Sequence, residues 1–454
     1  MSSTFPDVVI FLPGIAGSTL VRGGKVLWNL TSGFILKTLR EHQLEDLIIS
    51  SESHDIDLGD GIRPGEVIGG ISMIPGLMKS DLYGGFGQML RQSVGLRQGE
   101  NFFPFAYDWR RDNRVSAKRL ATFVDEKLAN WRKASGNDAA KVILIGHSMG
   151  GLVSRYYIEC LGGWQNVRRL FTLGTPHRGS LNALGFLANG LSKGIGPLHA
   201  DATLPLRSFA SVHQLLPTYP CIMQGGQHHR VSETEVPNLN RAMVEKAASF
   251  HSEIQDAIAQ NRQLDGYRAD YLSPVIGVRQ PTFQSASLTS NGVELLTDME
   301  GIELRDIGGD GTVPAPSALP VDLDAGVATH VWGAHSSLCK EESVREHMLA
   351  AVKFMGLDMD KFRSAPPRRG VSLWLDDAYE AGIAFPLIAT VQGGVNEQQL
   401  VAQAETEDGS PGPSTVLHKD GESYVGELTL PEGAWRLRVS GNIVPGIEDV
   451  VLAA

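Results

Sequence analysis

The stretch Lys141–Glu159, KVILIGHSMGGLVSRYYIE, changes its pattern abruptly at a serine. Four apolar residues, 142–145, predict a buried strand, and the residues from Gly150 onward predict an amphipathic helix. Ser148 lies between glycines where the two meet, in the pattern G-x-S-x-G. A strained turn of this kind suits a nucleophile for acyl transfer, because it exposes the side chain at the end of a strand. A tight turn with serine as a helix cap is the alternative interpretation.

The flanking sequence repeats this alternation. Short apolar runs at 7–12 and 167–173 predict strands, and helical spacing of apolar residues at 83–96 and 116–134 predicts helices. Strands that alternate with helices favour a mostly parallel central sheet with helices on both faces. The alternation breaks down over 178–304 and core-like signals resume afterwards, which predicts a large insertion rather than a second independent domain.

The C-terminal part of the chain follows another pattern. Residues 364–370, SAPPRRG, have the composition of a linker. Residues 371–454 alternate apolar and polar positions between glycine, proline and aspartate, which predicts a small all-β, sandwich-like domain. We therefore expect one large domain over 1–363, which contains the insertion, followed by the linker and an accessory domain.

Composition limits the class of protein. The 454 residues carry a formal net charge of −11, which argues against a partner that is nucleic acid. The three cysteines are too few and too scattered for a disulfide framework or a zinc site, and we expect no metal and no cofactor. The sequence shows no basic leader segment and no apolar stretch of membrane-spanning length, so the expected location is cytoplasmic.

A serine nucleophile needs a base and an acid that orients the base. In the chain order serine, acid, histidine, the sequence offers Asp310 in GGDGTVP and His335 in WGAHSSL. Both follow strand-like segments and lie in short stretches that contain glycine. Asp306 is the weaker candidate for the acid, and His330 is the competing candidate for the base.

An oxyanion hole requires two backbone N–H groups aimed at the developing negative charge. Met149 follows the serine directly and supplies one of them through the geometry of the turn. The loop 13–17, PGIAG, is the expected source of the second, with Ile15 as the first choice. A simple turn at the exit of the first strand is the alternative interpretation of this loop.

The order of these motifs resembles the lecithin:cholesterol acyltransferase family and its lysosomal phospholipase relatives, which are α/β-hydrolases. The matching stretches are, in order, FLPGIAGSTL, LWNL, FAYDWRRDN, LIGHSMGGL, FTLGTPHRGS, GGDGTVP and His335. The combination of YDWR before the serine and GTP-x-x-GS after it is specific, since most other lipases share only the G-x-S-x-G pattern. The resemblance covers about residues 6–355 and leaves the C-terminal β domain outside.

The resemblance implies an α/β-hydrolase fold, with the insertion at about 178–304 as its cap and lid. It implies a catalytic triad and two oxyanion donors, which are Ser148, Asp310 and His335, and Ile15 and Met149. Asp108 and Trp109 are candidate substrate contacts, and a buried aromatic residue beside a local ion pair is an equally weighted alternative. The segment 23–80 would hold an element that touches the membrane. Secreted relatives staple that element with a disulfide, whereas this chain has no cysteine before Cys160.

Members of the family cleave an acyl ester of a glycerophospholipid and pass the acyl group from serine to water or to an alcohol. The resemblance therefore implies a phospholipase A-type enzyme with O-acyltransferase activity, whose partners are a lipid ester and, transiently, a membrane surface. A lipase for neutral glycerides, a carboxylesterase and a lipid-binding pseudoenzyme without turnover are the alternatives. The β domain is open to two interpretations, a binding module for a protein partner or a stabilising appendage.

Overall fold

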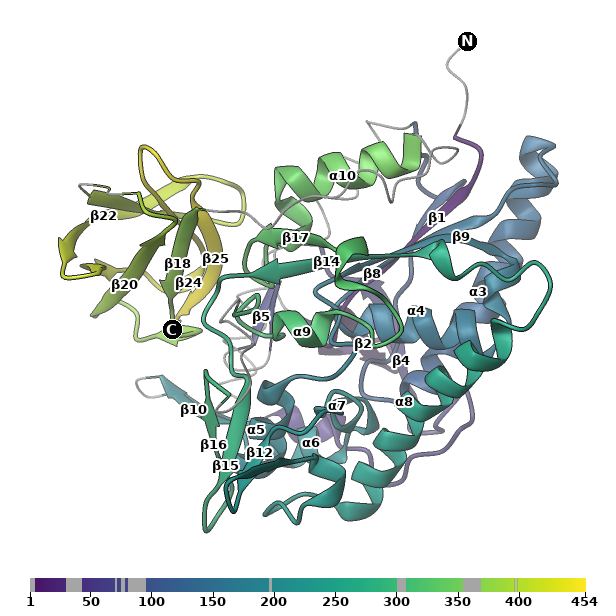
Figure 1. The fold of residues 1–454 in the computed structure, drawn as a ribbon, viewed down its shortest axis with the longest axis horizontal. Coiled ribbons are helices and arrows are strands. Elements are labelled where there is room, and N and C mark those ends of the chain that lie inside the picture. The colour runs from purple at the N-terminus through teal and green to yellow at the C-terminus, as the bar shows by residue number, and fades with distance from the viewer. Residues whose placement is uncertain are drawn as a thin grey trace.

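The structure is a computed structural model. It describes residues 5–29, 43–69, 72–74, 78–80, 95–195, 198–299, 308–353, 369–395, 397 and 399–454. Figure 1 shows a layered unit of helices and strands, with a separate curled all-β domain beside it. Within the described ranges, no helix has the length and apolar character needed to cross a membrane.

A six-stranded sheet forms the centre of the layered unit, and all of its strand pairs are parallel. Its strands, in spatial order, are β17 (Thr329–Trp332), β14 (Leu272–Val278), β9 (Val167–Leu173), β8 (Val142–His147), β1 (Val8–Leu12) and β7 (Phe102–Pro104). Every residue of β1, β8 and β14 is buried, as a sheet covered on both faces requires. The predicted parallel sheet is confirmed.

Alternate residues of the central strands face two different apolar layers. Val8 and Ile10 pack with α3 (Asn113–Ser135) and α4 (Met149–Cys160), whereas Val9 and Phe11 pack with α10 (Glu342–Lys353). Helix α3 contains the predicted helix at 116–134 and begins three residues before it. The helix predicted at 83–96 falls almost entirely outside the described residues.

The cap follows β9 and is built from short elements and one long helix, α8 (Arg241–Asn261). Its other elements are α5 (Leu181–Asn189), β10 (Ser192–Ile195), β11 (Leu198–Asp201), α6 (Thr203–Ser208), α7 (Ala210–His213), β12 (Ile222–Gln224), β13 (Gln227–His229), β15 (Ser285–Leu288) and β16 (Val293–Leu296). Strands β12, β13, β15 and β16 form one sheet.

The prediction of one continuous insertion over 178–304 is wrong, because part of this segment belongs to the central sheet. Strand β14 lies inside that range, yet it belongs to the central sheet, where it pairs with β9 on one side and with the edge strand β17 on the other. Ser273 and Pro274 interrupt its apolar run, so the segment lacks the uninterrupted β-branched pattern of β8. The chain thus returns to the central sheet between the two halves of the cap sheet.

The segment before α3 carries a small three-stranded sheet and several short elements. The three-stranded sheet consists of β2 (Ser18–Arg22), β3 (Lys25–Trp28) and β4 (Ile62–Val67). Strands β5 (Ser72–Ile74) and β6 (Met78–Ser80) pair with each other in a separate two-stranded sheet. The remaining short helices of the chain are α9 (Ala315–Ala318), η1 (Gln43–Leu47), η2 (Gly163–Gln165), η3 (Val231–Glu233), η4 (Ala269–Tyr271), η5 (Ala325–Val327) and η6 (Leu338–Lys340).

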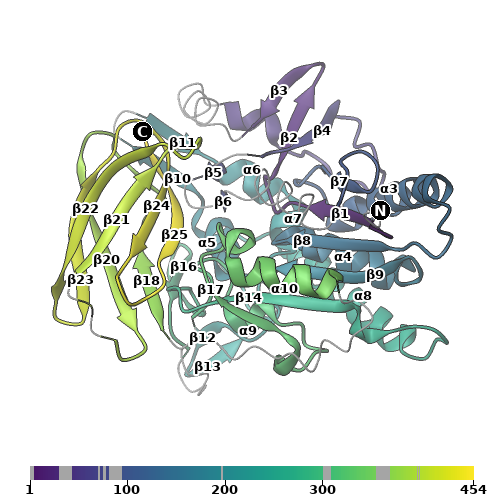
Figure 2. The same cartoon turned by 90° about the horizontal axis from the view of Figure 1, so that it is seen from above.

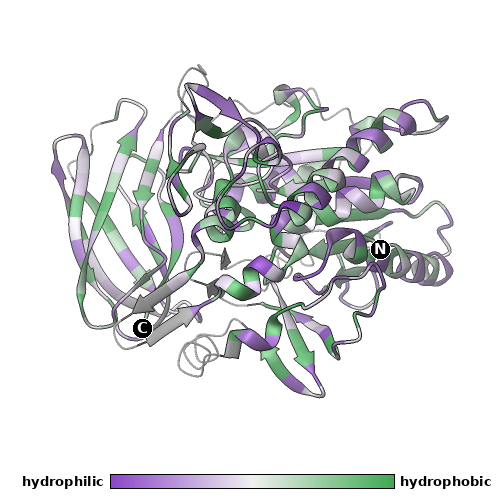
Figure 3. Cartoon of the chain, turned by 90° about the horizontal axis from the view of Figure 1, so that it is seen from below, coloured by the Kyte–Doolittle hydropathy of each residue, from purple (hydrophilic) through white to green (hydrophobic). Residues whose placement is uncertain are grey.

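The C-terminal domain is a single curled eight-stranded sheet (Figure 2). Its strands, in spatial order, are β18 (Gly370–Trp374), β20 (Ala384–Gln392), β23 (Ser423–Thr429), β22 (Pro411–Asp420), β21 (Gln399–Glu405), β24 (Gly433–Ser440), β25 (Ile447–Ala453) and β19 (Ala378–Tyr379). Hydrophobic and hydrophilic residues alternate along these strands (Figure 3), and in β20 the burial alternates with them. The predicted all-β domain is confirmed, and most of the predicted linker at 364–370 lies outside the described residues.

The two domains share an apolar cluster. Trp332, at the end of β17, packs into the core of the β domain, and its indole N–H donates to the carbonyl of Val371 at 2.8 Å. A Cβ atom at Gly370 would lie 2.6 Å from the Trp332 ring, so only glycine fits there. The first strand of the β domain therefore packs directly on the strand that leads to His335.

A partly buried carboxyl at this junction predicts a pH dependence. Burial raises the pKa of Glu341 to about 7, with a further contribution from the carboxylate of Glu448 on β25. Between the ordinary glutamate pKa and 7 the folded state holds a proton that the unfolded state has lost, so the free energy of unfolding should fall as pH rises, by roughly 2–3 kcal/mol. Urea unfolding from pH 4.5 to 8 tests this, because Glu341→Gln should lack that part of the slope. Parallel profiles for both proteins would refute it.

Candidate active site

Ser148 occupies the turn between β8 and α4 with a left-handed backbone, φ 52° and ψ −127°. Such a conformation is strained for a residue with a side chain and is typical of functional turns. The turn needs glycine beside it, because a Cβ at Gly150 would lie 2.5 Å from the carbonyl oxygen of Pro13. The strand, the sharp turn and the helix thus agree with the G-x-S-x-G prediction.

The predicted acid and base are hydrogen-bonded to each other. His335 Nδ1 lies 2.7 Å from Asp310 Oδ2, and both side chains are buried. The other carboxylate oxygen of Asp310 accepts the backbone N–H groups of Thr312 at 2.9 Å and Val313 at 2.7 Å. The backbone N–H of His335 also donates to the carbonyl of Asp310, at 2.7 Å. The carboxylate is therefore fixed in one orientation, which fixes the imidazole in turn.

Ser148 and His335 line one small cavity of about 40 Å³ below the cap. Ile15 lines it from the loop after β1, and apolar side chains from α5 and α7 close its far side, among them Ala183, Phe186 and Val212. Met149 is the first residue of α4 and is buried, but it is not among the residues that line the cavity. The structure thus brings the serine, the histidine and the candidate oxyanion loop to one apolar space.

The loop after β1 lies directly against the serine. A Cβ at Gly14 would come within 2.9 Å of Ser148 Cβ, and Ala16 has a left-handed φ of 59°. Two aromatic side chains anchor this loop, since the Tyr107 hydroxyl donates to the Pro13 carbonyl at 2.8 Å and the Trp28 indole N–H donates to the Ala16 carbonyl at 3.0 Å. The close approach favours an oxyanion loop over a simple strand-exit turn.

Comparisons with known proteins agree with this geometry. The family model that matches is that of lecithin:cholesterol acyltransferase, over residues 74–269. Phospholipase A(1) LCAT3 of Arabidopsis thaliana is 25% identical over 312 residues, which are 58% of this chain and 68% of that protein. Lecithin-cholesterol acyltransferase-like 4 of the same plant is 31% identical over 147 residues, 31% of this chain and 25% of that protein. The chain is a lecithin:cholesterol acyltransferase-like α/β-hydrolase.

A solved structure, the mature form of the lipase BlEst2 from Bacillus licheniformis, also matches this α/β-hydrolase. The two sequences are 14% identical, and the alignment covers 78% of this chain and 94% of the lipase, with a TM-score of 0.37. The family match and the curated relatives support an enzyme of the lipid acyl hydrolase class.

Two other predicted site residues of this α/β-hydrolase lie away from the cavity. Trp109 is buried against Trp28, and its indole N–H donates to the Ser18 carbonyl at 3.0 Å. Asp108 pairs with Arg110 at 2.6 Å. Neither residue is among those that line the cavity at Ser148. This geometry matches the alternative interpretation, a buried aromatic residue beside a local ion pair.

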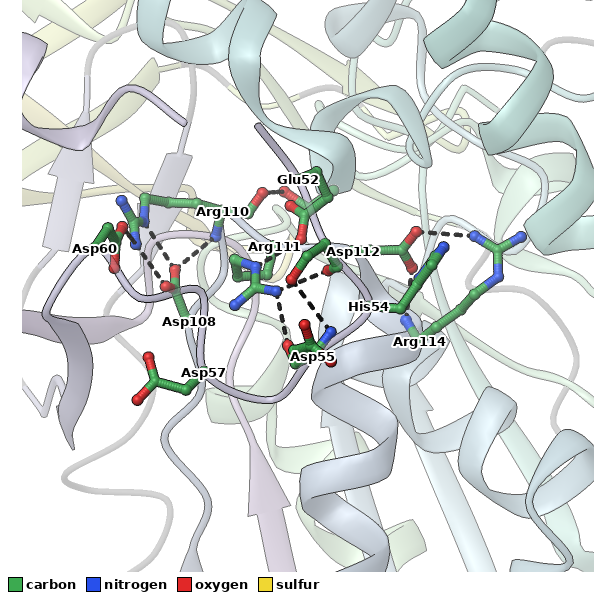
Figure 4. Close-up of polar contacts among 12 residues, drawn as sticks. Glu52, His54, Asp55, Asp57, Asp60, Asp108, Arg110, Arg111, Asp112 and Arg114 are labelled. Atoms are coloured by element: carbon green, nitrogen blue, oxygen red, sulfur yellow. Dashed lines mark hydrogen bonds and ion pairs between the residues drawn. The ribbon is translucent and has the colours of Figure 1, made fainter. Parts of the chain in front are cut away.

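Figure 4 shows that this ion pair belongs to a longer row of arginines and carboxylates. Arg110 also reaches Asp60 at 3.0 Å, and Arg111 reaches Glu52 at 2.7 Å. The row ties the described part of the segment 23–80 to the start of α3. These ion pairs hold the described part of that segment against the main domain, and its contact with a membrane stays a prediction.

The competing candidate for the base lies away from the cavity, and the competing candidate for the acid falls outside the described residues. His330 lies on β17, where burial lowers its pKa, and it does not line the cavity. Asp306 falls outside the described residues. The sequence-based selection of His335 and Asp310 over these two is consistent with the geometry, and their catalytic roles stay predictions.

Sequence reasoning missed two residues that shape the site. Gly174 has a φ of 57°, and a Cβ there would lie 2.7 Å from Asp310 Oδ2 and 2.9 Å from His335 Nδ1. The His147 ring lies tilted beside the His335 ring, with 4.8 Å between the ring centroids, and burial holds the pKa of His147 well below the ordinary value, so it stays neutral. Gly174 and His147 stand in the motifs GTPH and GHSMG, but these motifs do not predict which residues they contact, because the contacts come from distant segments of the chain.

The β domain also contacts the residue after His335. The Ser336 hydroxyl donates to Asp449 Oδ1 on β25 at 2.8 Å. We expect Asp449→Ala to lower kcat for a soluble ester about tenfold with little change in KM, because small displacements of a catalytic group are costly. Asp420→Ala, on an exposed end of the same sheet, is the control. Equal kcat values for the two variants would show that this bond does not position the histidine loop.

Proposed function

We propose that the protein is a serine lipid acyl hydrolase of the phospholipase A type, which forms an acyl-serine intermediate. The observation that carries the proposal is that His335, hydrogen-bonded to Asp310, lines the same small cavity as Ser148 beneath an apolar cap. The match to an acyltransferase family and the phospholipase among its relatives support a lipid ester as the substrate.

The geometry supports the following chemistry. His335 accepts the hydroxyl proton of Ser148 at Nε2 as Oγ attacks the ester carbonyl carbon, and Asp310 stabilises the imidazolium. The backbone N–H groups of Ile15 and Met149 stabilise the tetrahedral oxyanion. His335 then protonates the departing alcohol, which leaves the acyl group on serine.

The acyl-serine can pass its acyl group to water or to an alcohol. Transfer to an alcohol is the second candidate activity, and the name of the matching family favours it. An apolar cap over the serine supports transfer, because exclusion of water lets an alcohol compete for the acyl group. A cytoplasmic location with transient contact at membrane surfaces is also part of the proposal.

Release of free fatty acid from mixed phospholipid vesicles tests the proposal, together with labelling by a fluorophosphonate. Wild-type protein and His330→Ala should release fatty acid and take up the label, whereas Ser148→Ala should do neither. Addition of a long-chain alcohol should divert acyl groups into a new ester if transfer occurs. Equal labelling of Ser148→Ala and wild-type protein would overturn the assignment of the nucleophile.

A further inference from the structure

Three buried aromatic residues, Tyr107, Trp109 and Trp28, come from the motifs YDWR and LWNL. None of them is among the described residues that line the cavity at Ser148. Each of the three side chains carries one polar N–H or O–H group, and such a group needs an acceptor when its ring is buried. The acceptors therefore show what these residues do.

All three donors bond to one loop, residues 13–18, which follows β1. The acceptors are the carbonyl groups at its two ends and near its centre: Pro13 for the Tyr107 hydroxyl at 2.8 Å, Ala16 for the Trp28 indole at 3.0 Å and Ser18 for the Trp109 indole at 3.0 Å. A fourth bond joins the backbone N–H of Tyr107 to Ser18 Oγ at 3.2 Å. The loop is thus held at both ends and near its centre by groups from two distant segments.

The loop turns sharply at Ile15. The backbone N–H of Gly17 donates to the Gly14 carbonyl at 3.2 Å, which closes a tight turn with Ile15 and Ala16 at its centre. Ala16 has a left-handed φ of 59°, and a strained backbone persists only where its surroundings hold it. Ile15 lines the cavity, and no described group accepts a hydrogen bond from its backbone N–H. The turn leaves this donor available to an oxygen in the cavity.

The rings that hold the loop also pack on each other and on the cap. The ring centroids of Trp28 and Trp109 lie 5.1 Å apart, and those of Trp109 and Phe209 lie 5.6 Å apart, both in edge contact. Phe209 stands between α6 and α7, and Val212 on α7 lines the cavity. The loop and one wall of the cavity therefore rest on the same aromatic support.

The turn that carries two of these rings is fixed by charge. Arg110 is fully buried, and its guanidinium lies 2.6 Å from the Asp108 carboxylate and 3.0 Å from that of Asp60. It also donates to the Leu47 carbonyl at 3.1 Å. Loss of one partner would leave a buried charge uncompensated, which is costly. The turn is therefore a rigid base for the side chains on it.

We propose that Tyr107, Trp109 and Trp28 are positioning residues, which hold the Ile15 backbone N–H toward the oxygen that becomes negative during acyl transfer. Donors aimed in advance at the developing charge stabilise the transition state, and small displacements of such donors are costly. The inference rests on the proposed function. It assigns the motifs YDWR and LWNL a role in catalysis without contact to the substrate.

The test removes one donor at a time. Tyr107→Phe deletes a single hydroxyl and should lower kcat for a soluble ester about tenfold with KM within twofold, because the donor acts on the transition state more than on the bound ester. Trp28→Phe keeps an aromatic ring in place and should act in the same direction. It serves as the second variant if Tyr107→Phe does not fold.

A trifluoromethyl ketone with an acyl chain gives a readout of the oxyanion site itself. Ser148 Oγ adds to its carbonyl carbon, the serine proton passes to His335, and the carbonyl oxygen becomes the anion that the loop stabilises. The inhibition constant of this ketone should rise in Tyr107→Phe by about the factor by which kcat falls. A purely structural effect would not link the two quantities.

Two control variants lose the same kind of bond elsewhere. Tyr424→Phe removes a buried hydroxyl that donates to the Glu397 carbonyl at 2.7 Å in the β domain. Trp131→Phe removes an indole N–H on α3 that donates to the Pro6 carbonyl at 2.9 Å. Both should keep kcat and the inhibition constant within twofold of the wild-type values, measured well below the unfolding temperature of each variant.

The outcomes separate this role from the proposed function. If the wild-type protein hydrolyses the ester and Tyr107→Phe matches Tyr424→Phe in kcat, only the positioning role is wrong. A loss of kcat in Tyr107→Phe with an unchanged inhibition constant would overturn it as well. If the wild-type protein neither hydrolyses the ester nor binds the ketone, the proposed function fails and this role fails with it.

Discussion

An Asp310→Asn variant is expected to lose about 10⁴-fold in kcat while it keeps its fold. The two backbone N–H groups of Thr312 and Val313 both point at Oδ1 of residue 310, so the amide of asparagine must place its oxygen there. Its NH₂ group then faces His335 Nδ1 and donates to it. The imidazole is forced to carry its proton on Nε2, where it cannot accept the proton of Ser148. Steady-state kinetics on a soluble ester, with circular dichroism as the folding check, measure the effect.

The Asp306→Asn variant is the control for this prediction, since Asp306 is the other candidate for the acid. We expect it to keep kcat within about threefold of the wild-type value. If Asp306→Asn loses activity and Asp310→Asn keeps it, the acid has been assigned to the wrong residue. If both variants stay active, the histidine does not depend on a carboxylate partner for its tautomer.

The parts of the site that could be predicted are those with a local signature. The turn at Ser148 shows itself through adjacent glycines between a strand and a helix, and Asp310 and His335 stand in short loops after strand-like runs. Chain order then allowed the three to be combined. The fold was predictable for the same reason, because the alternation of strands and helices is a local pattern.

The parts that could not be predicted depend on contacts between distant segments. Strand β14 lacks a clear pattern of its own and is fixed by its neighbours β9 and β17. The packing of Trp332 into the β domain joins residues 39 positions apart in the sequence, and no pattern in either segment predicts this contact.

A Gly174→Ala variant is expected to lose about 100-fold in kcat, since an added methyl group would displace the acid and the base together. Its Cβ would lie 2.7 Å from Asp310 Oδ2 and 2.9 Å from His335 Nδ1, closer than real Cβ contacts come. Displacement of a catalytic group by about 1 Å is enough for a loss of this size. Kinetics on a soluble ester measure it, and the rate of fluorophosphonate labelling should fall in parallel, because labelling also needs the base.

Backbone strain alone would be a rival cause, because alanine at a φ of 57° costs roughly 1–2 kcal/mol. Gly136→Ala separates the two causes. Gly136 ends α3 with a φ of 68°, and a Cβ there would meet nothing within 4 Å. Gly136→Ala should lower the free energy of unfolding by the backbone strain alone and keep its activity, whereas Gly174→Ala should lower it further and lose activity. If Gly136→Ala loses as much activity, the effect comes from stability; if Gly174→Ala keeps full activity, the tight packing beneath the Asp310–His335 pair is not needed for catalysis.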